Sequence, residues 1–383
     1  MNSIPFNIPY LPSDSSKYIN KVFAAKKFCG DGQLTMLCSR QLENLYHAKK
    51  VLLTTSCTHS LEMAAILCGI QEGDEVVMSS FTFVSTANAF ILRGAKIVFV
   101  DIDPATMNID ESLIEAAITQ KTKAIVVMHY GGVACNMNAI SRLANQFNLF
   151  VIEDAAQCID AYYFDRPLGS IGVFGTLSFH ETKNIHCGEG GALIINDDQF
   201  IERAEIIREK GTDRSRFLSG MVDKYSWVDI GSSYLPSELN AAILLPQLES
   251  FHEVTEKRVL LWNLYFSLLS PLYEEKLIVL PFIPAGCQHN GHLFYIKCKD
   301  VTTRTKLMAY LKKNNVHAYF HYVPLHSSLA GKKYTVFHGE DIYTTSESER
   351  ILRLPLYFGL TVEEVHTVCD LVSKFFNTPL KKL

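Results

Sequence analysis

The sequence predicts an α/β protein, with a mixed, mainly parallel sheet in a large first domain and a smaller α+β domain after it. Three observations lead to this fold class. The chain has 383 residues, which is too long for one small core. From about residue 50 to 210, short apolar runs alternate with helical stretches, as in βαβ units. Two later runs, 175–180 and 191–196, lie too close together for a crossover helix and predict an antiparallel pair.

The elements of the alternating region follow from their own patterns. Apolar runs predict strands at 75–80, 96–101, 124–129 and 149–155. Helical periodicity predicts helices at 59–70, 111–120 and 137–148. In such a sheet, ligands bind beyond the carboxyl ends of the strands, so the residues just after each strand are the candidates for function.

The second half of the chain predicts the smaller unit. Residues 236–270 read as a long helical stretch with a proline interruption. A strand-like run at 292–298, a helix at 303–314, the run 316–325 and a final helix from about residue 361 follow. We place the boundary near residue 245, which gives a large domain at 1–245 that includes an N-terminal arm, and a small domain at 246–383.

Composition excludes several classes of protein. Hydrophobic residues make up 48% and charged residues 20%, as in globular proteins. The net charge is −4 and basic residues are spread out, so we expect no nucleic-acid partner. We expect no membrane partner and no secretory signal, because no apolar run approaches roughly 18 residues and the first residues lack a signal pattern. The ten cysteines show no paired metal or redox motif, which predicts reduced thiols, no metal and a cytoplasmic protein.

Two strand ends carry polar groups that allow two interpretations each. The helix start at 54–58 is rich in Ser and Thr, which either cap the helix or, with its free N–H groups and dipole, bind a phosphate. Asp154 ends an apolar strand, where a carboxylate needs a partner. It is either a helix cap or structural ion pair, or the group that faces a cationic ring nitrogen.

Lys183 follows another predicted strand, together with Ser178 and His180. A lone lysine is ordinarily a surface residue, but in a closed pocket its amine becomes a nucleophile able to form a Schiff base. Phe81 and Phe83 are either core residues or a platform for a flat ring. Pyridoxal 5'-phosphate (PLP) needs four things from a protein: a site that binds its phosphate, a side chain that stacks on its ring, a carboxylate beside its pyridinium nitrogen, and a lysine that forms a Schiff base. The candidates above would together supply all four.

The order of these motifs resembles the DegT/DnrJ/StrS family of sugar-nucleotide aminotransferases, over essentially the whole chain. The motifs are TSCT at 55–58, FTFVSTANA at 81–89, EDAAQ at 153–157, and SFHETKN at 178–184 followed by GEGG at 188–191. The resemblance implies PLP-dependent transferase fold type I, with a seven-stranded sheet. Within this family, the chain is most similar to the enzymes that make dTDP-4-amino-4,6-dideoxygalactose for enterobacterial common antigen. The resemblance therefore implies a role in the synthesis of such surface polysaccharides, among which we also count lipopolysaccharide.

The resemblance implies a role for each matching residue. Lys183 would bind the cofactor as a Schiff base and move the proton during transfer. Asp154 would pair with the pyridine nitrogen, Gln157 would lie near the ring hydroxyl, and Phe83 would stack on the ring. The phosphate contacts would be Thr58, the backbone at His59, and Ser178.

The resemblance also implies how substrate is bound. The nucleotide sugar is expected at His180 and, on the small domain, at His321, Tyr322 and His326, with a further contact from the CGDGQLT stretch at 29–35.

A homodimer with shared active sites is implied as well. Many family members carry Gly-x-Asn-x-Arg where this chain has Ser233 and Leu235. Ser233 of the partner subunit is therefore expected to give one hydrogen bond to the phosphate, whereas Leu235 cannot replace an arginine.

The expected reaction is amino transfer from L-glutamate to a keto-sugar nucleotide, dTDP-4-keto-6-deoxy-D-glucose, giving dTDP-4-amino-4,6-dideoxy-D-galactose. A gluco product, a 3-amino sugar and a non-catalytic binding or regulatory protein remain alternatives. Dehydratases of the same family place histidine where Lys183 stands, which argues against that activity. A nicotinamide dehydrogenase ranks last, because no Gly-x-Gly-x-x-Gly follows the first strand.

Overall fold

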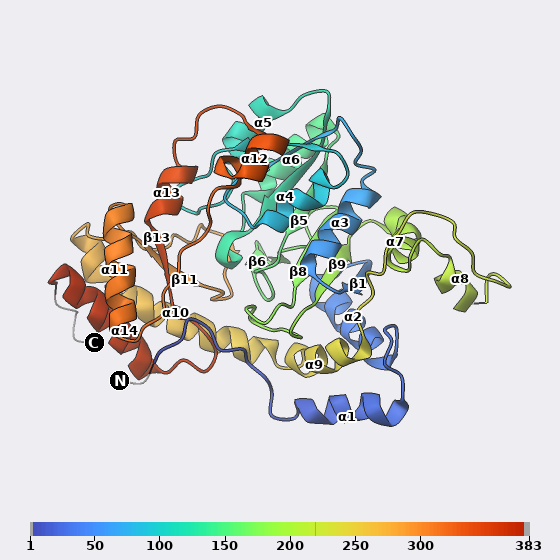
Figure 1. Ribbon diagram of the computed structural model, residues 1–383, viewed down its shortest axis with the longest axis horizontal. Helices are drawn as coiled ribbons and strands as arrows, with labels where there is room; N and C mark the ends of the chain where they lie inside the picture. The colour runs from blue at the N-terminus through green and yellow to red at the C-terminus, as the bar shows by residue number, and fades with distance from the viewer. Residues whose placement is uncertain (1–2, 219, 379–383) are drawn as a thin grey trace.

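An eight-stranded sheet forms the centre of the protein (Figure 1). The computed structural model describes residues 3–218 and 220–378. The strand order is β1-β9-β8-β5-β4-β2-β3-β12. The strands are β1 (Lys50–Thr54), β2 (Glu75–Ser79), β3 (Lys96–Val100), β4 (Thr122–Met128), β5 (Phe150–Asp154), β8 (Phe174–Ser178), β9 (Gly191–Ile195) and β12 (Thr335–Phe337).

The sheet is mixed and mainly parallel, which confirms the predicted fold class. Strands from β12 through β3, β2, β4 and β5 to β8 are parallel, whereas β9 is antiparallel to both β8 and β1. The pair β8–β9 is the predicted antiparallel pair. Its register places Ser178 opposite Gly191.

The eighth strand, β12, adds to the seven that the resemblance implied. It comes from the second half of the chain and pairs in parallel with β3 through three residues, 335–337. So short a segment has no periodicity of its own, and therefore only its tertiary pairing identifies it as a strand.

Apolar side chains alternate between two cores on the two faces of the sheet. In β1, Val51 and Leu53 join one cluster and Leu52 joins the other. Helices from different parts of the chain cover each face, as a parallel sheet requires. The first face is covered by α2 (Gln33–Tyr46), α5 (Ile114–Ala117), α6 (Met137–Phe147) and α9 (Glu238–Leu248), and the second by α3 (Cys57–Leu67), α4 (Val84–Ile91) and α7 (Ile201–Arg208).

Two predicted helices differ in extent from the structure. The stretch 111–120 forms only the 3-10 turn η1 (Glu111–Leu113) and the short α5. In the stretch 236–270, Pro246 lies within the last turn of α9 and does not end it. The break comes after Leu248, before α10 (Phe251–Glu274) begins.

A third apolar cluster lies in the second half of the chain, between helices and a two-stranded sheet. Antiparallel strands β11 (Phe294–Lys297) and β13 (Ile351–Leu354) form that sheet. The helices that pack around it are α10, α11 (Val301–Lys313) and α14 (Val362–Phe376), on the left in Figure 1. Shorter helices α12 (Leu329–Tyr334) and α13 (Thr344–Arg350) lead back toward the central sheet. The domain boundary near residue 245 stays a prediction.

Several peripheral elements complete the described chain. Helix α1 (Ser15–Ala25) lies along α9, and α8 (Arg214–Leu218) projects away from the body in Figure 1. A small sheet is formed by β6 (Tyr162–Tyr163), β7 (Arg166–Pro167) and β10 (Cys287–Gln288), and the remaining 3-10 turns are η2 (Tyr130–Gly132), η3 (Asp198–Phe200) and η4 (Leu325–Ser327). Within the described part of the chain, no helix has both the length and the apolar character to cross a bilayer.

Candidate active site

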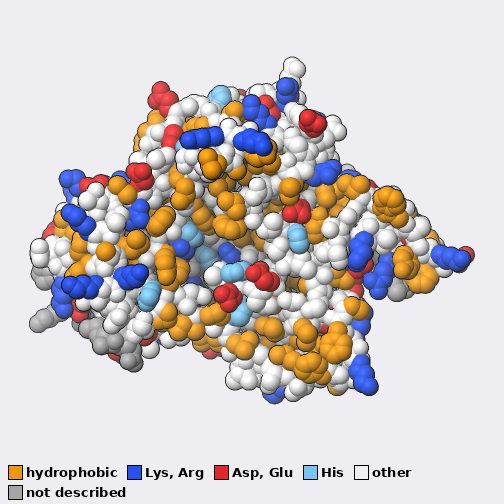
Figure 2. Space-filling model, viewed as in Figure 1, with side chains coloured by type: hydrophobic (Ala, Val, Ile, Leu, Met, Phe, Trp, Pro, Cys, Tyr) orange, Lys and Arg blue, Asp and Glu red, His pale blue; other side chains and the backbone are white. Residues whose placement is uncertain are grey.

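A cavity of about 630 Å³ lies where the carboxyl ends of the central strands meet the second half of the chain. Figure 2 shows a hollow near the middle of this face, with histidine side chains around it. Its position agrees with the rule that open α/β sheets bind ligands beyond their strand ends. The predicted site residues that line it are Thr58, Phe83, Asp154, Gln157, Ser178, His180, Lys183, His321 and Tyr322.

Asp154, the last residue of β5, brings a buried carboxylate to the cavity. Its Oδ2 accepts a hydrogen bond from Thr86 Oγ1 (2.6 Å), and its Oδ1 accepts one from the backbone N–H of Ala156 (3.2 Å). Burial raises the pKa of this carboxyl, and the two hydrogen bonds oppose that rise. No cationic side chain of the described residues forms an ion pair with it, so the carboxylate remains available to a cationic ligand.

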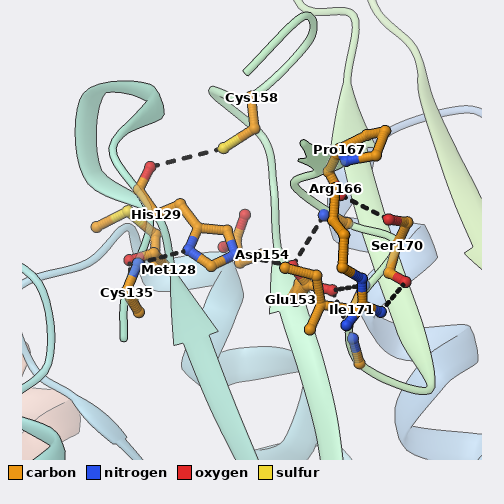
Figure 3. Close-up of polar contacts among 12 residues, drawn as sticks. Met128, His129, Cys135, Glu153, Asp154, Cys158, Arg166, Pro167, Ser170 and Ile171 are labelled. Atoms are coloured by element: carbon orange, nitrogen blue, oxygen red, sulfur yellow. Dashed lines mark hydrogen bonds and ion pairs between the residues drawn. The ribbon is translucent and has the colours of Figure 1, made fainter. Parts of the chain in front are cut away.

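The neighbouring Glu153 fixes the end of β5 (Figure 3). Its carboxylate accepts hydrogen bonds from three backbone N–H groups of the 169–172 turn, at 2.6–2.8 Å. It also bonds His129 Nε2 at 3.0 Å. Because His129 Nδ1 accepts from the N–H of Cys135 (3.1 Å), Nε2 carries the ring proton and donates it to Glu153. This buried network holds in place the strand end that presents Asp154.

Lys183 lies in the connection between β8 and β9 and lines the cavity. Its backbone N–H bonds to the carbonyl of His180 (2.9 Å), which forms a turn. No hydrogen bond or ion pair joins Lys183 Nζ to another residue in the described ranges. Burial lowers the pKa of this amine, and so increases the fraction that is neutral and nucleophilic. The structure therefore supplies a free amine within the cavity.

The start of helix α3 offers unpaired backbone N–H groups. Ser56 caps the helix, because its Oγ accepts from the N–H of His59 (3.1 Å). The first intrahelical bond runs from Ser60 N to Ser56 O (3.2 Å), so the amides of Cys57 and Thr58 precede the ladder. The capping interpretation is confirmed. The free amides lie at Cys57 and Thr58, whereas that of His59 is already used, and the His59 side chain does not line the cavity.

Strand β9 passes directly against this helix start. A Cβ on Gly191 would lie 2.4 Å from Cys57 N and from Ser56 C, so any side chain there would displace the loop. Ser178, opposite Gly191 on β8, lines the cavity from the same side. Because Gly191 has no side chain, β9 can pass close to the start of α3. Thr58, Ser178 and the free amides at Cys57 and Thr58 therefore lie together at one end of the cavity.

Gln157 links the central sheet to the second half of the chain. Its Oε1 accepts from the N–H of Gly131 (2.7 Å), and its Nε2 donates to Tyr322 Oη (3.0 Å). The ring of His321 stacks on that of Tyr322 at 3.9 Å. Burial, with smaller effects from nearby positive charges, lowers the pKa of His321 to about 2, so this imidazole is neutral at pH 7. A polar but uncharged wall results.

Phe83 and His180 have open faces toward the cavity. Phe83, just before α4, is 57% exposed, which leaves its ring free to cover a flat ligand. His180 Nδ1 accepts from the N–H of Thr182 (3.2 Å), and its Nε2 lies 3.6 Å from Glu189 Oε1. The side chain is thereby held at the cavity edge.

His326 and Ser233 lie away from the cavity of their own chain. Both ring nitrogens of His326 are engaged, Nδ1 with Ser80 Oγ (2.7 Å) and Nε2 with Asp341 Oδ2 (3.0 Å). His326 therefore fastens the loop before β12 to the end of β2, and the structure does not bring it to the predicted substrate site. Ser233 is exposed, and its contact to a partner subunit stays a prediction.

The CGDGQLT stretch, 29–35, is likewise held outside this cavity. The Glu238 carboxylate accepts from the backbone N–H groups of Gly32, Leu34 and Thr35, at 2.9–3.1 Å. Asp31 pairs with Arg208 at 2.8 Å. These contacts fix the stretch as the start of α2.

Sequence reasoning missed several cavity residues. Thr86 lies one helical turn after Thr82, and this spacing was a signal that its hydroxyl faces the strand ends. Arg353 is a lone cation inside the apolar strand β13, which was a signal that it has a buried role. Phe6 and Asn7 of the N-terminal arm also line the cavity, and nothing local in the sequence indicates that.

His186 and Cys187 have structural contacts. His186 Nε2 bonds the carbonyl of Tyr10 (2.8 Å), and its N–H bonds Gln247 Oε1 (3.0 Å). Cys187 is buried. Across residues 3–218 and 220–378, no group of His, Cys, Asp or Glu side chains is arranged to hold a metal ion.

The cavity fits PLP by its donor set. An unpaired amine at Lys183 suits the aldehyde carbon, and the unpaired carboxylate of Asp154 suits a protonated ring nitrogen. The free amides at Cys57 and Thr58, with Ser178, suit a phosphate group. The steric limit at Gly191 is independent support, because a side chain there would displace the backbone of Ser56 and Cys57, where these free amides begin.

Comparisons with known proteins agree with this geometry. Residues 9–373 match the model of the DegT/DnrJ/EryC1/StrS aminotransferase family. A pleiotropic regulatory protein of Geobacillus stearothermophilus is 34% identical, over 83% of this chain and 82% of that protein. The spore coat polysaccharide biosynthesis protein SpsC of Bacillus subtilis is 30% identical, over 96% of each chain. The crystal structure of S. venezuelae DesV in complex with a ketimine intermediate is 26% identical, with a TM-score of 0.89 over 98% of this chain and 99% of that one.

Proposed function

The chain belongs to the DegT/DnrJ/EryC1/StrS aminotransferase family, and on this premise we propose that it transfers the amino group of L-glutamate to dTDP-4-keto-6-deoxy-D-glucose. The enzymes of this family are PLP-dependent sugar aminotransferases, and so is this chain. The proposed product is dTDP-4-amino-4,6-dideoxy-D-galactose, a precursor of surface polysaccharides such as enterobacterial common antigen and lipopolysaccharide. The polysaccharide role named for the relative SpsC supports this placement.

One observation carries the proposal, namely the presence of Lys183 Nζ and the Asp154 carboxylate in the same cavity, each without an ion-pair partner among the described residues. When bound, PLP supplies an electron sink for the negative charge that develops at carbon during amino transfer. Asp154 would keep the ring nitrogen protonated, and Thr86 orients that carboxylate through its 2.6 Å hydrogen bond. Gln157 would lie near the ring hydroxyl and Phe83 would cover the ring.

Lys183 would both hold the cofactor and move a proton. Its neutral amine, favoured by a lowered pKa, is the form that attacks an aldehyde carbon. The same nitrogen, once released, would take the proton from the carbon of the amino donor. Its position between β8 and β9, on a turn closed by the carbonyl of His180, keeps the amine in the cavity for both tasks.

The phosphate would be bound at the start of α3. The amides of Cys57 and Thr58 and the hydroxyl of Ser178 provide the donors, while the Thr58 hydroxyl donates to Ser85 Oγ (2.8 Å), and the positive end of the helix dipole favours an anion there. The backbone of His59 was also expected to contact the phosphate. Its N–H instead donates to Ser56 Oγ, so it would contribute indirectly, by capping the start of α3.

The nucleotide sugar would enter over His180, His321 and Tyr322. All three line the cavity. Because the imidazole of His321 is neutral, it can form hydrogen bonds with the sugar without adding a positive charge to the site. The amination of C4 and the galacto configuration depend on which way the sugar ring faces the cofactor. A 3-amino sugar or a gluco product remains the alternative outcome.

A homodimer is part of the proposal. Apolar side chains are exposed on the segment after α8, where Trp227 is 79% and Met221 69% exposed. Figure 2 shows hydrophobic side chains gathered over this projection and over α1. Burying such a surface against a second copy would be favourable and would bring Ser233 of the partner subunit toward the phosphate.

The proposal is tested by product analysis. The protein, loaded with PLP, is incubated with L-glutamate and dTDP-4-keto-6-deoxy-D-glucose, and the nucleotide product is examined by NMR. We expect one amino group at C4 with axial geometry. An equatorial amine at C4 would contradict the proposed product and indicate the gluco isomer. Amination only of a 3-keto substrate, at C3, would contradict it and indicate a 3-amino sugar. Ligand binding without turnover would support the regulatory alternative.

A further inference from the structure

His292 places a neutral imidazole at the wall of the cavity. Its ring lines both the main cavity and a small adjoining one, which Lys183 and Asn184 also line. Burial lowers the pKa of this imidazole well below its ordinary value, and the charge of Lys183 is the next cause. The ring is therefore uncharged at pH 7, so one of its nitrogens carries a proton and the other is an acceptor.

The contacts of Asn184 show which nitrogen carries the proton. Asn184 Nδ2 donates to the carbonyl of Asn290 (3.1 Å), because a carbonyl can only accept. The amide oxygen of Asn184 is then the atom that lies 2.9 Å from His292 Nδ1. Since that oxygen also can only accept, Nδ1 carries the proton, and Nε2 has a free lone pair. No hydrogen bond or ion pair joins Nε2 to another residue in the described part of the chain.

The turn that carries His292 is held from several sides. Its backbone N–H donates to Asn290 Oδ1 (3.0 Å), and its carbonyl accepts from Arg258 Nη2 (2.6 Å). Asn290 Nδ2 in turn donates to the carbonyls of Gln157 (2.8 Å) and Ile159 (2.7 Å), in the segment that follows β5. Because its backbone, its ring orientation and its tautomer are all fixed, His292 presents the lone pair of Nε2 in one direction.

Lys183 is the donor that matches this acceptor. Its Nζ likewise has no partner among the described residues. Asn184, the next residue along the chain, ties the turn of Lys183 to His292. The flexible four-carbon stem of a lysine lets Nζ reach a neighbouring acceptor as well as a ligand. Once Lys183 has taken a proton, its ammonium has three N–H donors inside a buried cavity, where a donor without an acceptor is costly.

We propose that His292 is a positioning residue, whose Nε2 accepts a hydrogen bond from Lys183 Nζ whenever that amine is not bound to the cofactor. The proposal rests on the proposed function, in which Lys183 moves the proton. The hydrogen bond would hold the protonated amine in place for the second proton transfer. Lys183 serves both half-reactions, whereas the amino donor and the nucleotide sugar each serve one. Loss of the acceptor should therefore slow both half-reactions alike.

Two substitutions of His292 separate the acceptor from the structural contact. His292→Asn places an amide N–H near the position of Nδ1, which keeps a donor for Asn184 and removes the acceptor, whereas His292→Gln reaches the position of Nε2 and restores an acceptor. In the PLP-loaded protein, the cofactor absorbance is followed after addition of L-glutamate, and separately after addition of the 4-amino nucleotide sugar. We expect His292→Asn to slow both half-reactions about 10- to 100-fold, as loss of one charge-assisted hydrogen bond predicts, and His292→Gln to recover part of the rate.

A deuterium isotope effect distinguishes positioning from a loss of folded protein. With saturating L-glutamate deuterated at its α-carbon, the isotope effect should rise in His292→Asn, because proton transfer is the step that slows. A smaller fraction of folded protein would lower the amplitude and leave the isotope effect unchanged, and that result would contradict the inference.

His289→Asn is the matched control. His289 belongs to the same turn, packs against Trp262 at 4.4 Å between ring centroids, and does not line the cavity. Its Nδ1 accepts from the N–H of Gly291 (3.1 Å), and an asparagine oxygen can do the same. Both half-reactions and the isotope effect should match those of the unchanged protein. Equal changes in His289→Asn and His292→Asn would show that only the fold of the turn matters, and would contradict the inference.

Nitrogen NMR gives a readout that needs no turnover. In protein loaded with pyridoxamine 5'-phosphate, Lys183 is free, and its histidines carry isotopically labelled nitrogen. The signal of His292 Nε2, assigned by its loss in His292→Asn, should be that of an unprotonated nitrogen and should move when Lys183→Ala removes the donor. A protonated Nε2, a signal that does not respond to Lys183→Ala, or a loss of rate confined to the sugar half-reaction would overturn the inference.

The same measurements separate this inference from the proposed acceptor. An unchanged protein that reacts with L-glutamate and depends on His292 as described, but aminates no nucleotide sugar, would support the role of His292 and contradict the proposed substrate.

Discussion

Burial acts in opposite directions on the two groups that the reaction needs. It raises the pKa of the Asp154 carboxyl and lowers the pKa of the Lys183 amine, so each shifts toward its neutral form. For Lys183 the shift favours the nucleophile. For Asp154 it means that a cationic ring beside the carboxylate would restore a charge pair, which makes the site and the cofactor complementary at the level of single residues.

Asp154→Asn is expected to lower amino transfer about 100- to 1000-fold, because an amide cannot hold a proton on the ring nitrogen by charge. Turnover is measured per folded molecule, with circular dichroism as the check of folding. Asp101→Asn is the matched control, since Asp101 also lies buried just beyond a strand but accepts from the backbone of residues 342–344. It should lose stability and keep its turnover. Equal losses of turnover in Asp154→Asn and Asp101→Asn would contradict the role of Asp154 at the cofactor ring.

Single residues also show where sequence reasoning reaches its limit. Lys183 and Asp154 were identifiable because each stands at a predicted strand end, where ligands bind. Arg353 was missed, although a lone cation in an otherwise apolar strand was a signal, because only the fold brings that strand to the cavity. His326 was assigned to substrate, but its contacts with Ser80 and Asp341 come from segments that only the fold brings together.

At the scale of elements, the phosphate end depends on how closely β9 approaches α3. Gly191→Ala would place a methyl group 2.4 Å from Cys57 N, and this displaces the loop that offers its amides. We expect PLP affinity to fall at least about tenfold, measured by titration of the apoprotein, since a displaced loop loses charge-assisted hydrogen bonds.

Gly188→Ala is the control for that change. Gly188 has φ +82°, and a Cβ there would meet nothing within 4 Å. Alanine at this position should cost about 1–2 kcal/mol of stability through its left-handed backbone, with unchanged PLP affinity. If both variants bind PLP equally well, the close approach of β9 to α3 is not what shapes the phosphate site.

Most elements of the central sheet were predictable, since fully buried strands read as apolar runs and alternate with helices. β12 was not, because its three residues have no signal without β3 beside them. The stretch 111–120 has helical composition, yet it forms a 3-10 turn and one short helix. Asp110 caps that 3-10 turn by accepting from the N–H of Ser112, so local capping there favours the turn.

For the whole molecule, buried histidines in the second half of the chain predict acid sensitivity. Burial lowers the pKa of His289 to about 4, below its ordinary value near 6.5. In this interval the unfolded chain binds the proton and the folded one does not. Stability is therefore complete above about pH 6.5 and falls as the pH is lowered toward 4.

His289→Gln should remove part of this acid slope, on the order of 2 kcal/mol between pH 6.5 and 4. The free energy of unfolding is measured by urea titration at several pH values. His338→Gln serves as the control, because His338 is exposed. An acid slope that is the same in His289→Gln as in the unchanged protein would show that His289 is protonated equally in both states.

The central claim is that Lys183 performs PLP-dependent amino transfer from glutamate to a nucleotide sugar. Transfer of isotopically labelled nitrogen from L-glutamate to dTDP-4-keto-6-deoxy-D-glucose tests it most directly, with the unchanged protein and Lys183→Ala side by side under saturating PLP. We predict labelled amino sugar from the unchanged protein and none above background from the variant. Labelled product from Lys183→Ala at a rate within about tenfold of the unchanged protein would contradict the account.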